Sequence, residues 1–234
     1  MRSKIIVALD ILDKNKCFEM IDLLSDEIDI FKIGLAPYLS FGEEILAVLE
    51  QKNKKVFLDL KFHDIPNTVK NAASIATRKN VFMMNFHCLG GAEMLSQAKE
   101  AVNEAVSAGC QKPILLGVTI LTSMNRDALK SIGMTDDMEE AVANLAILAK
   151  KNGMDGVVAS AQETKMIKEL CGKDFIVVTP GIRPLWSAKG DQSRIVTPKQ
   201  AFQDGSDYIV IGRPIIAADD PREATKKILE EIDE

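Results

Sequence analysis

Eight short apolar runs, rich in β-branched residues, alternate with longer helical stretches along nearly the whole chain. The runs lie at residues 5–9, 30–33, 56–61, 81–87, 114–119, 156–160, 175–179 and 208–211. Apolar strands separated by helices are typical of buried parallel strands that are joined by crossovers. Helical periodicity is clearest at residues 13–24, 92–105 and 138–151.

Eight β–α units predict an α/β fold in which one closed (β/α)8 TIM barrel forms a single domain over residues 1–234. The chain length supports this prediction, because such barrels commonly have about 250 residues. No linker-like or low-complexity tract divides the sequence. An open doubly wound sheet has the same alternation and stays open as the alternative.

Charge and apolar content limit the partners of the chain. A net charge of −5 argues against a dedicated nucleic-acid binder, so we expect no nucleic-acid partner. No apolar run is long enough to span a bilayer, so we expect no membrane partner. The first residues lead directly into a strand without a signal peptide, which predicts a cytoplasmic protein.

The four cysteines have neither CxxC nor metal-type spacing. We therefore expect reduced, buried thiols that behave as small apolar residues. These residues are Cys17, Cys88, Cys110 and Cys171.

Polar and ionisable residues follow the predicted strands at the end where ligands bind in both architectures. They are Asp10, Lys32, Asp59, Lys61, Thr122, Ser123, Arg183 and Arg213. A single charge at a strand end carries little information, because every strand must reach the surface somewhere. Several such residues at the same end indicate a built site.

The segment from Asp59 to Asp64 has the pattern DxKxxD. Asp59 and Lys61 are two residues apart on a predicted strand, so their side chains should lie on the same side. Asp64 follows in the loop, near enough to bracket the lysine, and Asn67 or Thr68 can cap the next helix. Such an array keeps Lys61 protonated and able to give a proton to a reactive carbanion. A purely structural cluster of ion pairs is the alternative.

Two glycine–arginine segments after the last two strands favour a phosphate site. Gly212 lets backbone N–H groups approach a ligand, and Arg213 can make bidentate phosphate contacts. The loop from Pro180 to Arg183 lies at the other usual phosphate position of such barrels. The polar stretch 183–194 could close over a ligand and bring Gln192 onto it. The alternative for Gly212 and Arg213 is a tight turn with a surface arginine. The alternative for the stretch 183–194 is a solvated loop.

The sequence contains no pattern typical of a metal site or of a dinucleotide-binding site. His63 and His87 lack a carboxylate at ligand spacing, so we expect no metal site. There is no GxGxxG motif and no P-loop.

Five segments together resemble orotidine 5′-phosphate decarboxylase, in its shorter bacterial form. They are VALD at 7–10, FKIG at 31–34, DLKFHDIPNT at 59–68, TPGIR at 179–183 and IGRPI at 211–215. The resemblance covers essentially the whole chain in the same order, and the DxKxxDIPNT segment is its most specific part. One departure lies at residues 87–91, where Cys88 and Leu89 stand in place of expected small residues.

The resemblance implies a homodimer that converts orotidine 5′-phosphate to UMP and carbon dioxide, the last step of de novo pyrimidine synthesis. Lys61 would protonate C6 and Asp59 would face the departing carboxylate. Asp10 and Lys32 would bind the ribose hydroxyls, with Lys32 also part of the charge network.

The resemblance also implies roles for residues outside this array. Three of them would reach into the partner's site: Asp64, Ile65 and Thr68. The pyrimidine would be bound by Thr122 or its neighbour Ser123, next to Pro180. The phosphate would be held by Arg183, Gln192, Gly212 and Arg213, and Gln192 would also touch the base.

Loss of carbon dioxide from C6 leaves a lone pair in the ring plane, where the ring delocalises it poorly. Most decarboxylases recruit an electron sink such as PLP or thiamine, and the sequence has no motif for either. We therefore expect no cofactor, with preorganised positive charge from Lys61 as the main stabiliser.

Two other functions stay open on the sequence. Hexulose-6-phosphate synthase and ketogulonate-6-phosphate decarboxylase share the DxKxxD pattern but stabilise a magnesium-bound enediolate. A catalytically silent barrel that only senses a phosphorylated nucleotide is the second alternative.

Overall fold

The structure is a computed structural model that describes residues 2–187 and 196–233. In these residues, eight parallel strands pair with their sequence neighbours, and β8 pairs with β1 to close a barrel. The strands are β1 (Ile5–Ala8), β2 (Ile30–Gly34), β3 (Lys55–Phe62), β4 (Met83–His87), β5 (Ile114–Val118), β6 (Gly156–Val158), β7 (Ile176–Thr179) and β8 (Tyr208–Ile211). The predicted TIM barrel is confirmed, and the open-sheet alternative is wrong.

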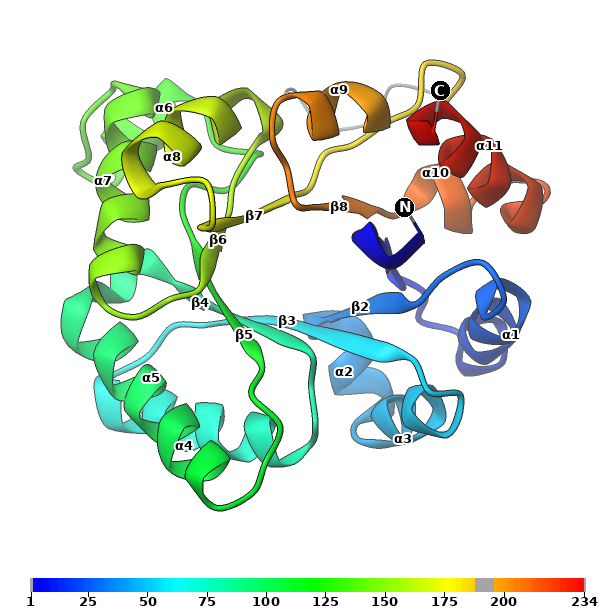
Figure 1. Cartoon of the computed structure of the whole chain (residues 1–234), viewed down its shortest axis with the longest axis horizontal. Coiled ribbons are helices and arrows are strands. Elements are labelled where there is room, and N and C mark those ends of the chain that lie inside the picture. Colours follow the sequence, from blue (N-terminus) through cyan, green and yellow to red (C-terminus); the bar gives the residue numbers. More distant parts are fainter. Residues whose placement is uncertain (1, 188–195, 234) are drawn as a thin grey trace.

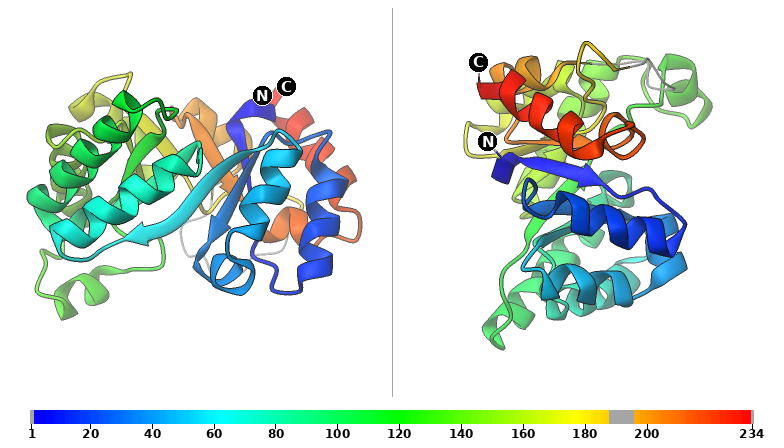
Figure 2. Two further views of the ribbon diagram at one scale, coloured as in Figure 1. Left: turned by 90° about the horizontal axis from the view of Figure 1, so that it is seen from below. Right: turned by 90° about the vertical axis from the view of Figure 1, so that its right-hand side faces the viewer.

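The helices lie around the outside of the barrel in chain order (Figure 1). They are α1 (Lys14–Leu24), α2 (Leu35–Phe41), α3 (Glu44–Gln51), α4 (Pro66–Arg78), α5 (Gly91–Ser107), α6 (Arg126–Ser131), α7 (Met138–Lys151), α8 (Thr164–Cys171), α9 (Pro198–Gln203), α10 (Arg213–Ile216) and α11 (Pro221–Asp233). Three short 3-10 helices complete the described elements: η1 (Arg2–Lys4), η2 (Cys88–Gly90) and η3 (Ala161–Glu163). The last helix, α11, contacts α1, so the two ends of the chain meet on one side of the barrel (Figures 1 and 2).

Most element boundaries differ by only a few residues from the predicted ones, but one predicted cap is wrong. Helix α4 begins at Pro66 with Ile65 as its N-cap residue, so neither Asn67 nor Thr68 caps it. Proline has no N–H to leave unsatisfied and its φ suits the first helical position, which moves the start of the helix forward. At α1 and α7 the aspartates Asp13 and Asp137 accept hydrogen bonds from first-turn N–H groups.

Two apolar cores follow from the alternation of side chains along each strand. Along β2, Phe31 and Ile33 pack outward against the helices, whereas Ile30 points into the barrel. The interior cluster consists of Ile6, Ala8, Ile30, Phe57, Met83, Leu116, Val178 and Val210. This cluster fills the barrel below the residues that follow on the same inward rows.

Two aspartates organise the N-terminal end of the barrel. Asp155 accepts from the backbone N–H of Leu115 at 2.9 Å and lies 3.3 Å from the Lys112 ammonium. Asp207 accepts from the backbone N–H of Val177 at 2.7 Å and from the Lys168 ammonium at 2.6 Å. At this end, carboxylates bind the backbone N–H groups of neighbouring strands and so fix the strands to one another.

All four cysteines are free, and three are buried as expected: Cys17, Cys88 and Cys171. Cys110 is only half-buried, because it lies in the turn after α5 rather than on an inward face, so its expected burial is wrong. Within the described residues, no helix combines the length and the apolar character needed to cross a membrane.

Candidate functional site

Along the first three strands, the side chains that point into the barrel form an inward row. Each inward row changes from apolar to charged toward the C-terminal end of the barrel. On β2 the row runs from Ile30 to Lys32, and on β3 it runs from Phe57 to Asp59. The β1 row continues beyond Ala8 to Asp10. Because parallel strands all end at the same rim, the side chains that follow the interior cluster meet there.

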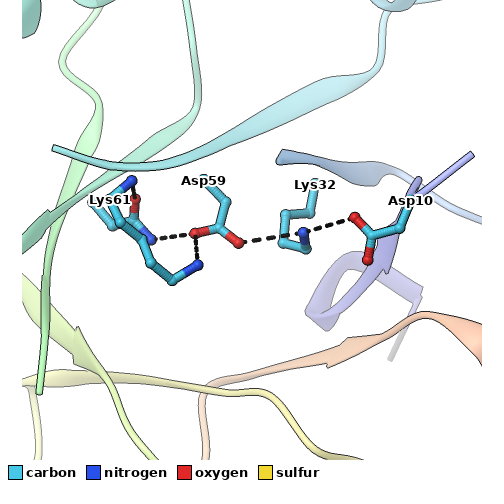
Figure 3. Close-up of polar contacts among 5 residues, drawn as sticks. Asp10, Lys32, Asp59 and Lys61 are labelled. Atoms are coloured by element: carbon cyan, nitrogen blue, oxygen red, sulfur yellow. Dashed lines mark hydrogen bonds and ion pairs between the residues drawn. The ribbon is translucent and has the colours of Figure 1, made fainter. Parts of the chain in front are cut away.

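Four of these side chains form one continuous row of alternating charge (Figure 3). The Lys32 ammonium lies 3.3 Å from Asp10 Oδ1 and 3.2 Å from Asp59 Oδ2. The Lys61 ammonium lies 2.7 Å from Asp59 Oδ1. Asp59 is the centre of the row and is only 8% exposed. Each of its two oxygens has a lysine partner, so both oxygens are fixed inside the protein.

Asn85 on β4 is a fifth member of this cluster that sequence reasoning missed. Its side-chain amide donates to Asp59 Oδ1 at 2.6 Å, and its oxygen accepts from the backbone N–H of Lys61 at 2.8 Å. A signal was present in the sequence. Asn85 follows the inward-facing Met83 by two residues and precedes His87 by two, so the period of a strand places it on the inward row.

Lys61 has a backbone conformation that is rare for a residue with a side chain. Its φ is +50°, and the register of β3 against β4 shifts between Leu58 and Phe62. A left-handed conformation costs about 1–2 kcal/mol for such a residue. Asp59 and Lys61 do lie on the same side, as their spacing predicts, but a bulge rather than a regular strand brings them there.

A cavity of about 390 Å³ lies against the Lys32–Asp59–Lys61 part of the row. The opposite wall comes from the last four strands and the loops that follow them, and most of it is apolar. This wall includes Val118, Ile120, Leu121, Thr122, Ser123, Val158, Ala159, Pro180 and Val210. The cavity therefore has one charged wall and one apolar wall, with hydroxyl groups at Thr122 and Ser123.

A second cavity of about 150 Å³ shares Lys32, Pro180 and Val210 with the first. Its other lining residues include Asp10, Gly181, Arg183, Gly212 and Arg213. Arg183 is buried, with 7% exposure, whereas Arg213 is exposed. Gly181 has a φ of +81°, so the turn that leads to Arg183 favours a glycine at this position. The two predicted arginine segments thus meet beside the charged row.

Three candidate site residues lie away from both cavities of their own chain. Asp64, Ile65 and Thr68 are exposed, and Ile65 has 67% of its surface accessible. The Asp64 carboxylate accepts from the Ile65 backbone N–H at 2.6 Å. Among the described ion pairs none joins Asp64 to Lys61, so the expected bracketing within one chain is not present. Gln192 lies outside the described residues.

His63 and His87 stack on each other beside the charged row, with ring centroids 5.2 Å apart. Burial, followed by the positive charge of His63 and Lys61, lowers the pKa of His87 below its ordinary value of 6.5. Neither imidazole lines the two cavities. In the part of the chain that the structure describes, no three His, Cys, Asp or Glu side chains gather as a metal-binding group.

Known proteins match this chain over its whole length. A protein from Carboxydothermus hydrogenoformans named orotidine 5′-phosphate decarboxylase is 47% identical over 233 residues, which cover 100% of this chain and 97% of that protein. One of the same name from Geotalea daltonii is 46% identical, covering 99% of this chain and 96% of that protein.

A crystal structure of orotidine 5′-phosphate decarboxylase from Lactobacillus acidophilus superposes with a TM-score of 0.86 at 38% identity, and all of both chains is covered. Residues 3–228 match the family described as Orotidine 5′-phosphate decarboxylase / HUMPS. The chain therefore belongs to the Orotidine 5′-phosphate decarboxylase / HUMPS family.

Proposed function

We propose that this chain is an orotidine 5′-phosphate decarboxylase, which converts orotidine 5′-phosphate to UMP and carbon dioxide in pyrimidine biosynthesis. Family membership and the names of the similar proteins support this activity. The observation that carries the proposal is the charged row from Asp10 to Lys61, which lines two adjoining cavities. The smaller of these cavities is also lined by two arginines. The larger cavity is of the size that small-ligand sites have, about 300–1,000 Å³.

The two cavities suggest how the nucleotide lies. Arg183, Gly212 and Arg213 would hold the phosphate in the smaller cavity, assisted by Gln192. Asp10 and Lys32 line that cavity beside the larger one, where they would bind the ribose hydroxyls. The pyrimidine would occupy the larger cavity, with Thr122 as a hydrogen-bonding partner and Pro180 against the ring.

The proposed chemistry takes place at Lys61. The bond between C6 and the carboxylate breaks, carbon dioxide leaves, and the electron pair stays on C6. The Lys61 ammonium stabilises this negative charge and then transfers a proton to C6, which leaves a neutral amine. The lysine therefore acts first as an electrostatic partner and then as the acid.

Asp59 has a different role in this proposal. It faces the departing carboxylate, and its ion pairs to Lys32 and Lys61 hold both ammonium groups in place. Because Asp59 is buried and both of its oxygens are engaged, it cannot turn away when the substrate enters. The site is thus organised before binding, which is the condition for strong electrostatic catalysis.

A homodimer would complete each site. Asp64, Ile65 and Thr68 lie just after Lys61 in the sequence but are exposed, as residues that reach into a partner's site would be. The expected cytoplasmic location stays a prediction.

The decisive experiment is a spectrophotometric assay with orotidine 5′-phosphate, with and without EDTA. We expect the same conversion to UMP in both arms, because Lys61 supplies the positive charge that a metal would supply in magnesium-dependent relatives. Absence of turnover would contradict the decarboxylase activity. Turnover that stops in EDTA and returns with magnesium would contradict the metal-free mechanism alone.

A further inference from the structure

We propose that Asn85 is a positioning residue that fixes both the carboxylate of Asp59 and the backbone of Lys61. The inference rests on the proposed decarboxylase function and adds a residue to its machinery. Asn85 is fully buried, and it is not among the residues that line the larger cavity. Any effect it has on the reaction must therefore pass through the residues it touches.

The two ends of the Asn85 amide make two different contacts. Its N–H2 group donates to Asp59 Oδ1, the same oxygen that binds the Lys61 ammonium, and its oxygen accepts from the Lys61 backbone N–H. The reversed amide would place oxygen against a carboxylate oxygen and N–H against N–H. Only one orientation of Asn85 is compatible with its surroundings, so the side chain fixes the positions of both partners.

The bulge in β3 explains why Lys61 needs such a partner. Leu58 pairs with Met84 and Phe62 pairs with Phe86, so four steps along β3 correspond to two steps along β4. Asn85 is the single β4 residue between these pairs. Residues added in a bulge lose the backbone hydrogen bonds of a regular ladder. At Lys61 the side-chain oxygen of Asn85 accepts the backbone N–H instead. The left-handed backbone that directs the Lys61 side chain is stabilised by this contact.

The central test compares Asn85→Ala with the wild type and with the control Ser206→Ala. The control removes another buried side-chain hydrogen bond, at 2.7 Å between Ser206 and Thr179, in a residue that lines neither cavity. Because a misplacement of about 1 Å can cost about 10²-fold in rate, we expect kcat of Asn85→Ala to fall by about 10²-fold. KM and the affinity for UMP should change by less than about threefold, since the nucleotide contacts remain. The control should keep the wild-type kcat.

A second variant, Asn85→Asp, keeps the shape of the side chain and adds a pH-dependent readout. Asp59 and Lys61 on β3 face this position directly, Lys32 on β2 lies beyond Asp59, and His87 follows on β4 with His63 stacked on it. Burial and the negative charge of Asp59 would raise the pKa of the introduced carboxyl. Its protonated form can donate to Asp59 and accept from the Lys61 N–H, as the amide does. We expect kcat, relative to the wild type at the same pH, to rise as pH falls.

The outcomes separate this inference from the proposed function. A wild-type protein that does not decarboxylate orotidine 5′-phosphate contradicts the proposed function. If the wild type is active and Asn85→Ala keeps its kcat, the positioning role is wrong while the function stands. If Asn85→Ala fails to fold, the isosteric Asn85→Asp decides: relative kcat that does not change with pH overturns the inference, and recovery at low pH supports it.

Discussion

The two walls of the larger cavity are built on the same plan from different residues. On β2 and β3 the inward-facing side chains at this wall are Lys32, Asp59 and Lys61. On β5, β6 and β8 the corresponding rows present Val118, Val158 and Val210 to the same cavity. The two walls differ in their side chains and, at Lys61, in the bulge that interrupts the regular pairing of β3 with β4.

The apolar wall makes the charged wall more effective. Charges interact more strongly where apolar groups exclude water and lower the effective dielectric constant. Because positive and negative groups alternate along the row, each lysine has a carboxylate partner that holds its ammonium group in place. A lysine held in this way beside an apolar surface is suited to stabilise a carbanion that forms between the two walls.

The largest expected effect comes from the charged wall. Lys61→Ala should lower kcat by at least about 10⁴-fold, because it removes both the electrostatic partner and the acid. UMP binding should remain measurable by calorimetry. Lys112→Ala, which removes an exposed lysine near the N-terminal end of the barrel, is the matched control and should leave kcat unchanged. Turnover of Lys61→Ala near the wild-type rate would show that the charged wall is not the catalytic one.

A mixing experiment tests whether the charged wall is complete within one chain. Lys61→Ala and Asp64→Ala should each be inactive alone, and co-refolding them should restore activity if Asp64 serves the partner's site. Half of the randomly paired dimers are hybrids and each hybrid has one intact site of two, so about a quarter of the wild-type rate is expected. No recovery, with mixed dimers detected by native mass spectrometry, would argue that Asp64 does not cross the interface.

The apolar wall is tested by a change that adds polarity without adding size. Val158→Thr places a hydroxyl in the wall, and we expect kcat/KM to fall by about tenfold, as an unpaired polar group there costs about 1–3 kcal/mol. The control is Val157→Thr on the same strand, because Val157 packs outward against the helices. Equal losses of kcat/KM in both variants would mean that polarity of the cavity wall is not what matters.

The N-terminal end of the barrel should affect stability alone. Asp207→Ala removes the acceptor for the Val177 N–H and the partner of Lys168. We expect the free energy of unfolding in urea to fall by about 1–3 kcal/mol, and kcat of the folded fraction to stay unchanged. A loss of kcat without a loss of stability would contradict the separation between the two ends of the barrel.

The smallest effect concerns pH and His87. Because its pKa is lowered in the folded state, the unfolded chain binds the proton more readily than the folded chain does. His87 therefore contributes stability that is present above pH 6.5 and is lost as pH falls through the folded pKa. The free energy of unfolding of His87→Gln should therefore decline less steeply below pH 6.5 than that of the wild type. An unchanged slope would exclude His87 as its source.

Much of the fold was predictable because it depends on local patterns. The apolar runs and their helical connections indicate the eight strands, and the strand ends indicate Asp10, Lys32 and Asp59 without knowledge of any contact. The start of α4 was predicted wrongly, because Asn67 and Thr68 are good capping residues, whereas Pro66 favours the first helical position and makes Ile65 the N-cap residue.

The missed parts of the site depend on contacts between strands. Asn85 is a neutral residue in an apolar run, so a search for charges passes over it, although its place on the inward row could have revealed it. The left-handed conformation of Lys61 arises from the register between β3 and β4, which no local pattern specifies. In the proposed homodimer, the place of Asp64 would depend on a second chain.

The central claim, that an ammonium group at position 61 enables the reaction, can be tested by chemical rescue. Lys61→Cys should be inactive, and alkylation with 2-bromoethylamine should rebuild a lysine-like ammonium. Burial raises the pKa of Cys17 to about 11 and that of Cys88 to about 12, so these thiols should react slowly. Alkylated wild type serves as the control for reaction at the half-buried Cys110. We predict that alkylation increases kcat of the variant by at least about 10²-fold. A variant that remains inactive, although mass spectrometry shows the new thioether at position 61 and UMP still binds, would contradict the account.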